Sequence, residues 1–178
     1  MAALLSAGAC GDDGDDATAT TTTRPTTTST STTTTVPERP ISTTTTAFDP
    51  TSVEGQVEAA YLKSWDVYAD AVYNLELDET ALSEVFAEAS LTTRRDEIAA
   101  RIDAGRAALV RLDHAYQIVL VDDSTAAVVD NFVNHQVLID PVTKAPLEDD
   151  PNERLLVNFK LQRIDGAWKV THIEKVGE

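Results

Sequence analysis

The apolar residues of this chain change their spacing once, close to residue 112, and that change constrains the fold more than any other feature. Before it, apolar side chains recur three and four positions apart, which is the period of an amphipathic helix. After it, apolar and polar side chains alternate, as in a strand with one buried face. Helices followed by strands predict an α+β domain, with the helices packed on one face of a sheet.

The helical part begins with a start signal. Thr51 and Glu54 have the spacing of a capping box, so we expect a long first helix from here. A shorter helix is expected over residues 79–89, and a third over 93–109, with Gly105 weakening its last turn. The inward face of the first helix is expected to carry Val53, Val57, Ala60, Tyr61, Ser64, Trp65, Tyr68 and Val72.

Antiparallel strands are expected in the second half of the chain. They cover residues 112–121, 126–139, 155–161 and 168–173. Asp165-Gly166 is a strong signal for a two-residue hairpin turn between the last two. A polar loop over 140–152 separates the second strand from the third. The strands therefore form a meander.

The closing hairpin carries a resemblance to a known family. Residues 163–170 read Arg-Ile-Asp-Gly-Ala-Trp-Lys-Val, and together with the order of elements they resemble the nuclear transport factor 2-like (SnoaL-like) family. The resemblance covers residues 49–178 and implies a cone, in which N-terminal helices pack on a curved, mainly antiparallel four-stranded sheet. In this family the sheet and the first helix usually enclose a pocket, and the open sheet face often forms dimers. A homodimer is therefore expected.

The first 48 residues have a different character. Residues 1–10 end in small side chains before Cys10 and resemble the lipobox of bacterial lipoproteins. The resemblance implies a signal peptide remnant that begins inside the true signal, a lipid on Cys10, and anchoring at the extracytoplasmic face of the cell membrane. The alternative is a cytosolic protein with an incidental cysteine. Residues 11–48 are rich in Thr and Pro, which predicts a disordered linker like that of actinobacterial-type lipoproteins.

Charge and sequence motifs restrict the classes of partner, cofactor and metal that can be expected. The formal net charge is -16, whereas phosphate binding needs clustered Lys and Arg, so nucleic acid is not an expected partner. The sequence has no glycine-rich phosphate loop and no nucleophile elbow, so no cofactor is expected. The histidines form no tight local pair, and no metal site is expected either.

The candidates for chemistry are histidines and polar residues on the strands. His114, His135 and His172 fall on three different strands, and alternation puts His172 on the inward face unless a bulge reverses it. Alternation also puts Asp130 and His135 on opposite faces, so no pair has the spacing of a catalytic dyad and no catalytic residue is assigned. The candidate pocket-lining residues are Tyr61, Trp65, Tyr68, Asp130, Asn131, His135 and His172.

Two functions stay open at this point. The first is a non-catalytic extracytoplasmic module that binds a small apolar ligand or a protein partner of the envelope. The alternative is an acid–base enzyme, of isomerase or dehydratase type, acting on a hydrophobic carbonyl compound through Asp130, His135 or Tyr61. The aromatic stripe of the first helix fits either an ordinary core or a ligand-facing wall.

Overall fold

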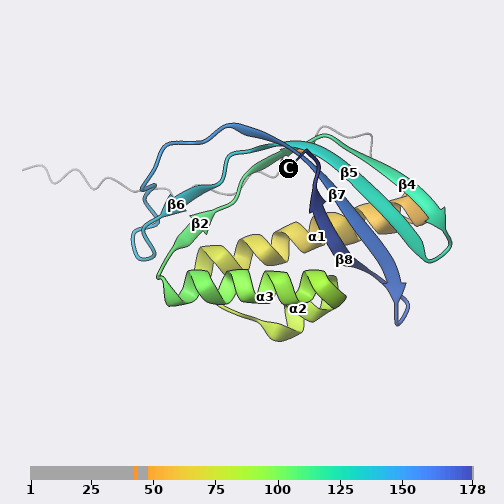
Figure 1. The fold of residues 1–178 in the computed structure, drawn as a ribbon, viewed down its shortest axis with the longest axis horizontal. Helices are drawn as coiled ribbons and strands as arrows, with labels where there is room; N and C mark the ends of the chain where they lie inside the picture. Colours follow the sequence, from red (N-terminus) through yellow and green to blue (C-terminus); the bar gives the residue numbers. More distant parts are fainter. Residues whose placement is uncertain (1–41, 44–47, 178) are drawn as a thin grey trace, which may run out of the picture. The chain divides into compact units, whose positions relative to one another are not determined.

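The computed structural model describes residues 42–43 and 48–177. The expected signal remnant, Cys10 and nearly all of the expected linker lie outside the described residues. In the described part, three helices are followed in sequence by a sheet that curves over α1, and α3 lies beside α1 and packs on β8 (Figure 1). A two-residue strand, β1 (Ser42–Thr43), precedes the helices and pairs with the sheet, inside the range assigned to the linker.

The first helix, α1 (Val53–Asn74), is the long aromatic helix that the apolar spacing predicts. It begins one residue later than the expected capping box, because Ser52 is the N-cap and its Oγ accepts a hydrogen bond from Gly55 N at 3.0 Å. The Thr51 hydroxyl instead donates to Asp49 Oδ1. The helix ends at Leu75, whose φ of 55° makes a left-handed cap.

The next two helices, α2 (Glu79–Val85) and α3 (Glu88–Asp103), have bounds that differ from the expected ones. α2 ends early because Phe86 takes an extended conformation and bridges to Val170 in the sheet. Ala87 N donates to Val170 O at 2.9 Å, and Ser90 Oγ donates to the same oxygen. The start of α3 is therefore attached to the sheet. Leu109, expected on this helix, belongs to a strand that follows the helix.

The strands of the described residues form two sheets. The larger has the order β1-β3-β5-β7-β8 with β4 also paired to β5, and every pair in it is antiparallel except β1 with β3. β3 and β4 are one expected strand interrupted at Ala115, so the predicted meander is present. The strand bounds are β2 (Ala107–Leu109), β3 (Leu112–His114), β4 (Tyr116–Asp122), β5 (Thr125–Asn134), β6 (Val137–Ile139), β7 (Glu153–Ile164) and β8 (Ala167–Lys175).

The expected second strand, 126–139, is divided between the two sheets. β5 ends at Asn134 in the larger sheet, and β6 begins at Val137 and pairs with β2 in the smaller one. Buried positions are even-numbered toward the end of β5, as at Asp130 and Phe132, but odd-numbered in β6. Alternation therefore cannot be carried across residues 135 and 136. The prediction of one continuous strand is wrong here.

The main core lies between the inner face of the larger sheet and the three helices. Its fully buried side chains from α1 include Val57, Tyr61 and Val72, and those from β7 and β8 include Leu161 and Val170. This arrangement is the predicted α+β class, with helices on a curved, mainly antiparallel sheet, and the prediction is confirmed. No helix in the described part combines the length and the apolar character needed to cross a bilayer.

Candidate functional site

Three buried polar side chains meet beneath α1 and form a buried cluster of Tyr61, His114 and Asp130. The Tyr61 hydroxyl donates to Asp130 Oδ2 at 2.6 Å, and His114 Nδ1 lies 2.6 Å from the same oxygen. Tyr61 and Asp130 are both 0% exposed and His114 is 2% exposed. A polar cluster at this depth is stable only because its members satisfy one another.

Strand register explains why the cluster forms. Asp130 in β5 is paired with Tyr116 in β4, and His114 lies two residues before Tyr116 on the same face. A diagonal neighbour across an antiparallel pair is within reach of a long side chain. The other carboxylate oxygen, Asp130 Oδ1, accepts a hydrogen bond at 2.9 Å from Ala115 N, at the break between β3 and β4. Asp130 thus binds both a side-chain partner and the interrupted backbone.

An aromatic layer covers the buried cluster. Trp65 Nε1 donates to the Tyr61 hydroxyl oxygen at 2.9 Å, which fixes the indole against the cluster. The Trp65 ring centroid lies 5.6 Å from that of Phe132, 5.8 Å from that of Phe159 and 6.0 Å from that of His114. These are edge-to-face and tilted contacts of the kind that aromatic rings prefer.

Burial controls the protonation of Tyr61. Desolvation raises the pKa of the Tyr61 phenol well above its ordinary value, and the nearby Asp130 carboxylate raises it further. The phenol therefore stays neutral through the physiological range and acts as a hydrogen-bond donor.

A cavity of about 310 Å³ opens on the other side of the aromatic layer. This inner cavity lies between α1 and α3 on one side and the inner face of β3, β5, β7 and β8 on the other. Its lining combines apolar and aromatic side chains with charged and amide side chains. The lining residues include Trp65, Tyr68, Arg94, Glu97, Arg101, Leu112, Phe132, Asn134, Gln136, Glu153, Leu155, Val157, Phe159, Ile173 and Lys175.

One carboxylate, that of Glu97, contacts three other residues of the cavity lining. It accepts hydrogen bonds from the Tyr68 hydroxyl at 2.5 Å and from Arg94 Nη1 at 2.7 Å, and it lies 3.7 Å from Arg101 Nη2. Burial, and next the Glu97 charge, raise the pKa of Tyr68 to about 12. The Tyr68 phenol is therefore a neutral donor that holds Glu97 in place.

The sequence candidates fall in different places. Tyr61 and Asp130 lie together in the buried cluster, and neither is among the lining residues of the inner cavity. Trp65 touches both the cluster and the cavity, and Tyr68 lines the cavity. Asn131 is exposed, since it follows the buried Asp130 on the opposite face of β5.

The other two candidates also lie outside the cluster. His135 is partly exposed, with its Nδ1 2.9 Å from Asp150 Oδ2 and its Nε2 3.3 Å from Asp113 Oδ2. His172 is exposed, and its expected inward position is wrong. The register between β7 and β8 shifts here, and Val170 and Thr171 are both buried, so the next residue points outward.

Four residues of the site were not assigned from the sequence, His114 in the buried cluster and Arg94, Glu97 and Arg101 in the lining of the inner cavity. The partner of Asp130 is His114, which sequence reasoning placed among the strand histidines without joining it to the candidate site. The pairing could have been found by assuming that residues 112–122 form one strand with a single register against β5. This register places His114 diagonally opposite Asp130. Arg94, Glu97 and Arg101 share one face of α3 at spacings of three and four, and this helical spacing was their signal.

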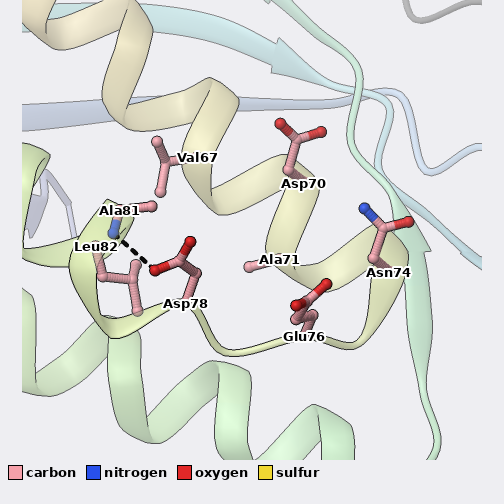
Figure 2. A pocket seen from close by; sticks show the side chains of 8 residues that line it. All are labelled: Val67, Asp70, Ala71, Asn74, Glu76, Asp78, Ala81 and Leu82. Carbon is pink, nitrogen blue, oxygen red and sulfur yellow. Dashed lines mark hydrogen bonds between the residues drawn. The ribbon is translucent and has the colours of Figure 1, made fainter.

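A second hollow of about 220 Å³ lies at the end of α1 (Figure 2). Figure 2 shows side chains from α1, from the loop after it and from the first turn of α2, with Asp78 Oδ1 accepting a hydrogen bond from Ala81 N. Three of the lining residues, Asp70, Glu76 and Asp78, are acidic. No group of three His, Cys, Asp or Glu side chains in the described part is placed to hold a metal ion.

Comparison with known proteins bears on the fold. No family model matches the sequence, and no curated protein is significantly similar to it. The intermembrane space region of the chloroplast protein ARC6 is similar over 72% of this chain and 100% of that chain, with 17% identity and a TM-score of 0.56. An NTF2-like protein from Cytophaga hutchinsonii is similar over 70% of this chain and 99% of that one, with 16% identity and a TM-score of 0.46. At 17% identity, the similarity to the ARC6 region shows a shared fold alone.

Proposed function

We propose that this chain is a membrane-tethered, extracytoplasmic, non-catalytic protein whose domain binds a small apolar ligand in the inner cavity. The observation that carries the proposal is the cavity itself, whose volume of about 310 Å³ lies at the small end of the range of ligand sites. Its apolar surface includes Trp65, Phe132 and Phe159, and charged and amide side chains make up the rest of the lining. Such a site favours a ligand of about one or two rings.

The buried cluster supports the non-catalytic part of the proposal. Tyr61, His114 and Asp130 are almost completely buried, and the aromatic layer that contacts them also walls the inner cavity. A general base must come within hydrogen-bond reach of its substrate, directly or through one water. A ligand in the cavity would touch Trp65 rather than Asp130. The cluster is then a structural feature of the core.

A neutral fluorescent probe tests the cavity. We expect 1-N-phenylnaphthylamine to bind with a rise in emission and with one site per domain. Leu155→Trp would fill the cavity and abolish the rise, because Leu155 lines it. Arg154→Trp is the matched control, since Arg154 is exposed at the preceding position of β7 and the change should leave binding unchanged. Equal binding by both variants would place the probe elsewhere and remove the proposal.

The tether is proposed from the sequence. Cys10 ends a lipobox-like segment, and the Thr-rich linker of residues 11–48 would hold the domain away from the membrane surface. Mass spectrometry of detergent-extracted protein is expected to find an acylated Cys10 as the first residue. An unmodified chain that still begins at Met1 would refute the anchor.

An acid–base enzyme is the second candidate, and the buried cluster is the observation that favours it. The contact between His114 and Asp130 resembles a dyad, with Tyr61 as a third polar group. The test is deuterium exchange into 2-tetralone, a hydrophobic ketone, in heavy water. Exchange that the protein accelerates and that Asp130→Asn abolishes would establish this function. We expect no acceleration, because the cluster does not reach the cavity.

A homodimer through the outer sheet face is also proposed. Val119 in β4 and Leu156 in β7 are 52% and 39% exposed, and the pairing of both strands with β5 puts them on the same outer face. Light scattering should give twice the monomer mass, and Leu156→Glu should restore the monomer mass. A wild-type protein that is monomeric at high concentration would remove the dimer.

A further inference from the structure

Arg94 occupies an unusual position in the wall of the inner cavity. Its guanidinium carbon lies 4.4 Å from the Tyr68 ring centroid and 5.6 Å from that of Trp65. Its side chain is only 14% exposed. A guanidinium stacked on two rings is held in a fixed orientation, so its N–H groups point in defined directions.

The hydrogen bonds of Arg94 are incomplete. Nη1 donates to Glu97 Oε2 at 2.7 Å. Nε, by contrast, is buried and has no hydrogen-bond partner among the described residues. A guanidinium carries only donors, and a buried donor without an acceptor is unfavourable. A ligand in the cavity reaches Arg94 through the 14% of its side chain that is exposed, and a small shift of the guanidinium would also bring Nε within reach of the ligand's acceptor.

The charges around Arg94 also favour a ligand that carries a negative charge. On α3, Arg94 and Arg101 share the single carboxylate of Glu97, which leaves one excess positive charge in this group. The chain as a whole carries -16, so this local excess runs against its overall balance. A ligand with a single negative charge would neutralise this group. A cationic ligand would increase the imbalance.

We infer that the inner cavity takes a small ring-sized carboxylic acid, whose carboxylate binds Arg94 and whose apolar body packs on Trp65 and Phe132. The inference rests on the proposed function of the cavity as a ligand site. A carboxylate is planar and accepts two hydrogen bonds side by side, which suits the fork of a guanidinium. The cavity volume of about 310 Å³ limits the body to about one or two rings.

The test compares an acid with its neutral isostere. Phenylacetate and phenylacetamide are used to displace bound 1-N-phenylnaphthylamine at pH 7, and calorimetry measures each directly. We expect phenylacetate to bind at least about tenfold more tightly to the wild type. Arg94→Gln should remove this preference, and Arg94→Lys should restore only part of it.

The matched control is Arg95→Gln. It removes the same charge from the neighbouring position of α3, where Arg95 makes an exposed ion pair with Glu79. The preference for phenylacetate should survive in it. Equal binding of acid and amide by the wild type, or a preference that persists in Arg94→Gln, would overturn the inference and leave the apolar ligand site standing. Failure of the neutral probe to bind would overturn both.

Discussion

Asp130 and His114 are joined across two strands by a contact of 2.6 Å between Oδ2 and Nδ1, at a depth where neither side chain meets solvent. Polar contacts at such depth usually belong to an active site or to a network that specifies one packing. Here the cluster also receives the Ala115 backbone N–H at the break between β3 and β4. Its position favours the second role.

Asp130→Ala tests that role through stability. Removing the carboxylate leaves Tyr61, His114 and the Ala115 N–H without their acceptor, so the free energy of unfolding should fall by about 3–5 kcal/mol. Urea unfolding at pH 7 measures it. Asp123→Ala, at an exposed turn, is the control and should change stability by no more than about 0.5 kcal/mol. Similar values for the two variants would contradict the structural role.

The raised pKa of Tyr68 predicts that the protein loses stability at alkaline pH. Its pKa is raised to about 12, so the folded state holds the proton more tightly than the unfolded state. The stabilisation is complete below about pH 10, the ordinary value, and is lost as the pH rises toward 12. Tyr61 acts in the same direction. Urea unfolding at pH 8, 10 and 11 should show a flatter decline for Tyr68→Phe than for the wild type, and parallel declines would refute the assignment.

The lowered pKa of Asp150 predicts a change in folding stability at acidic pH. Its pKa is lowered, first by the Asn152 backbone N–H and then by His135 and Arg111. A lowered pKa stabilises the folded state above about pH 4 and ceases to do so as the carboxylate is protonated. Asp150→Asn should therefore be less stable than the wild type at pH 6, with a gap that closes toward pH 3. Asp149→Asn, at the exposed neighbouring position, should show no such closing gap.

Two effects of opposite sign act on the stability of Gly55→Ala. Helix propensity alone predicts that the change stabilises α1 by about 1 kcal/mol. A Cβ at this position, however, would lie 2.1 Å from Asp49 O and 2.8 Å from Asp49 C. The turn that caps the helix would have to move, so we expect a net loss of about 1–3 kcal/mol in thermal or urea unfolding. A stabilised variant would show that the turn yields freely.

Much of the fold could be predicted because it depends on local patterns. The helical spacing fixed the face of α1 that carries Tyr61 and Tyr68, and both are buried. The hairpin at Asp165-Gly166 also follows from local chemistry, since both residues have positive φ angles, 52° and 83°. Bounds that depend on distant contacts were predicted less well. α2 ends at Val85 because Phe86 pairs with Val170, far along the chain.

The candidate site shows the same division. Tyr61, Trp65 and Asp130 were singled out from residue type and position, and the structure brings these three together. The partner of Asp130 depends instead on the register of β3 and β4 against β5, which pairs Asp130 with Tyr116 and so brings His114 within reach. Arg94 and Arg95 look alike in sequence, and only the packing of α3 decides which one enters the cavity wall.

The sequence by itself determined the α+β class, the meander and the inward face of the first helix, because periodicity and turn chemistry act over a few residues. Only the tertiary structure decided that Asp130 meets His114, that His172 points outward and that Arg94 lines a cavity. Those outcomes depend on register, on a shift between β7 and β8, and on the placement of a helix against a sheet. Each is set by contacts between residues distant in sequence, which local patterns do not encode.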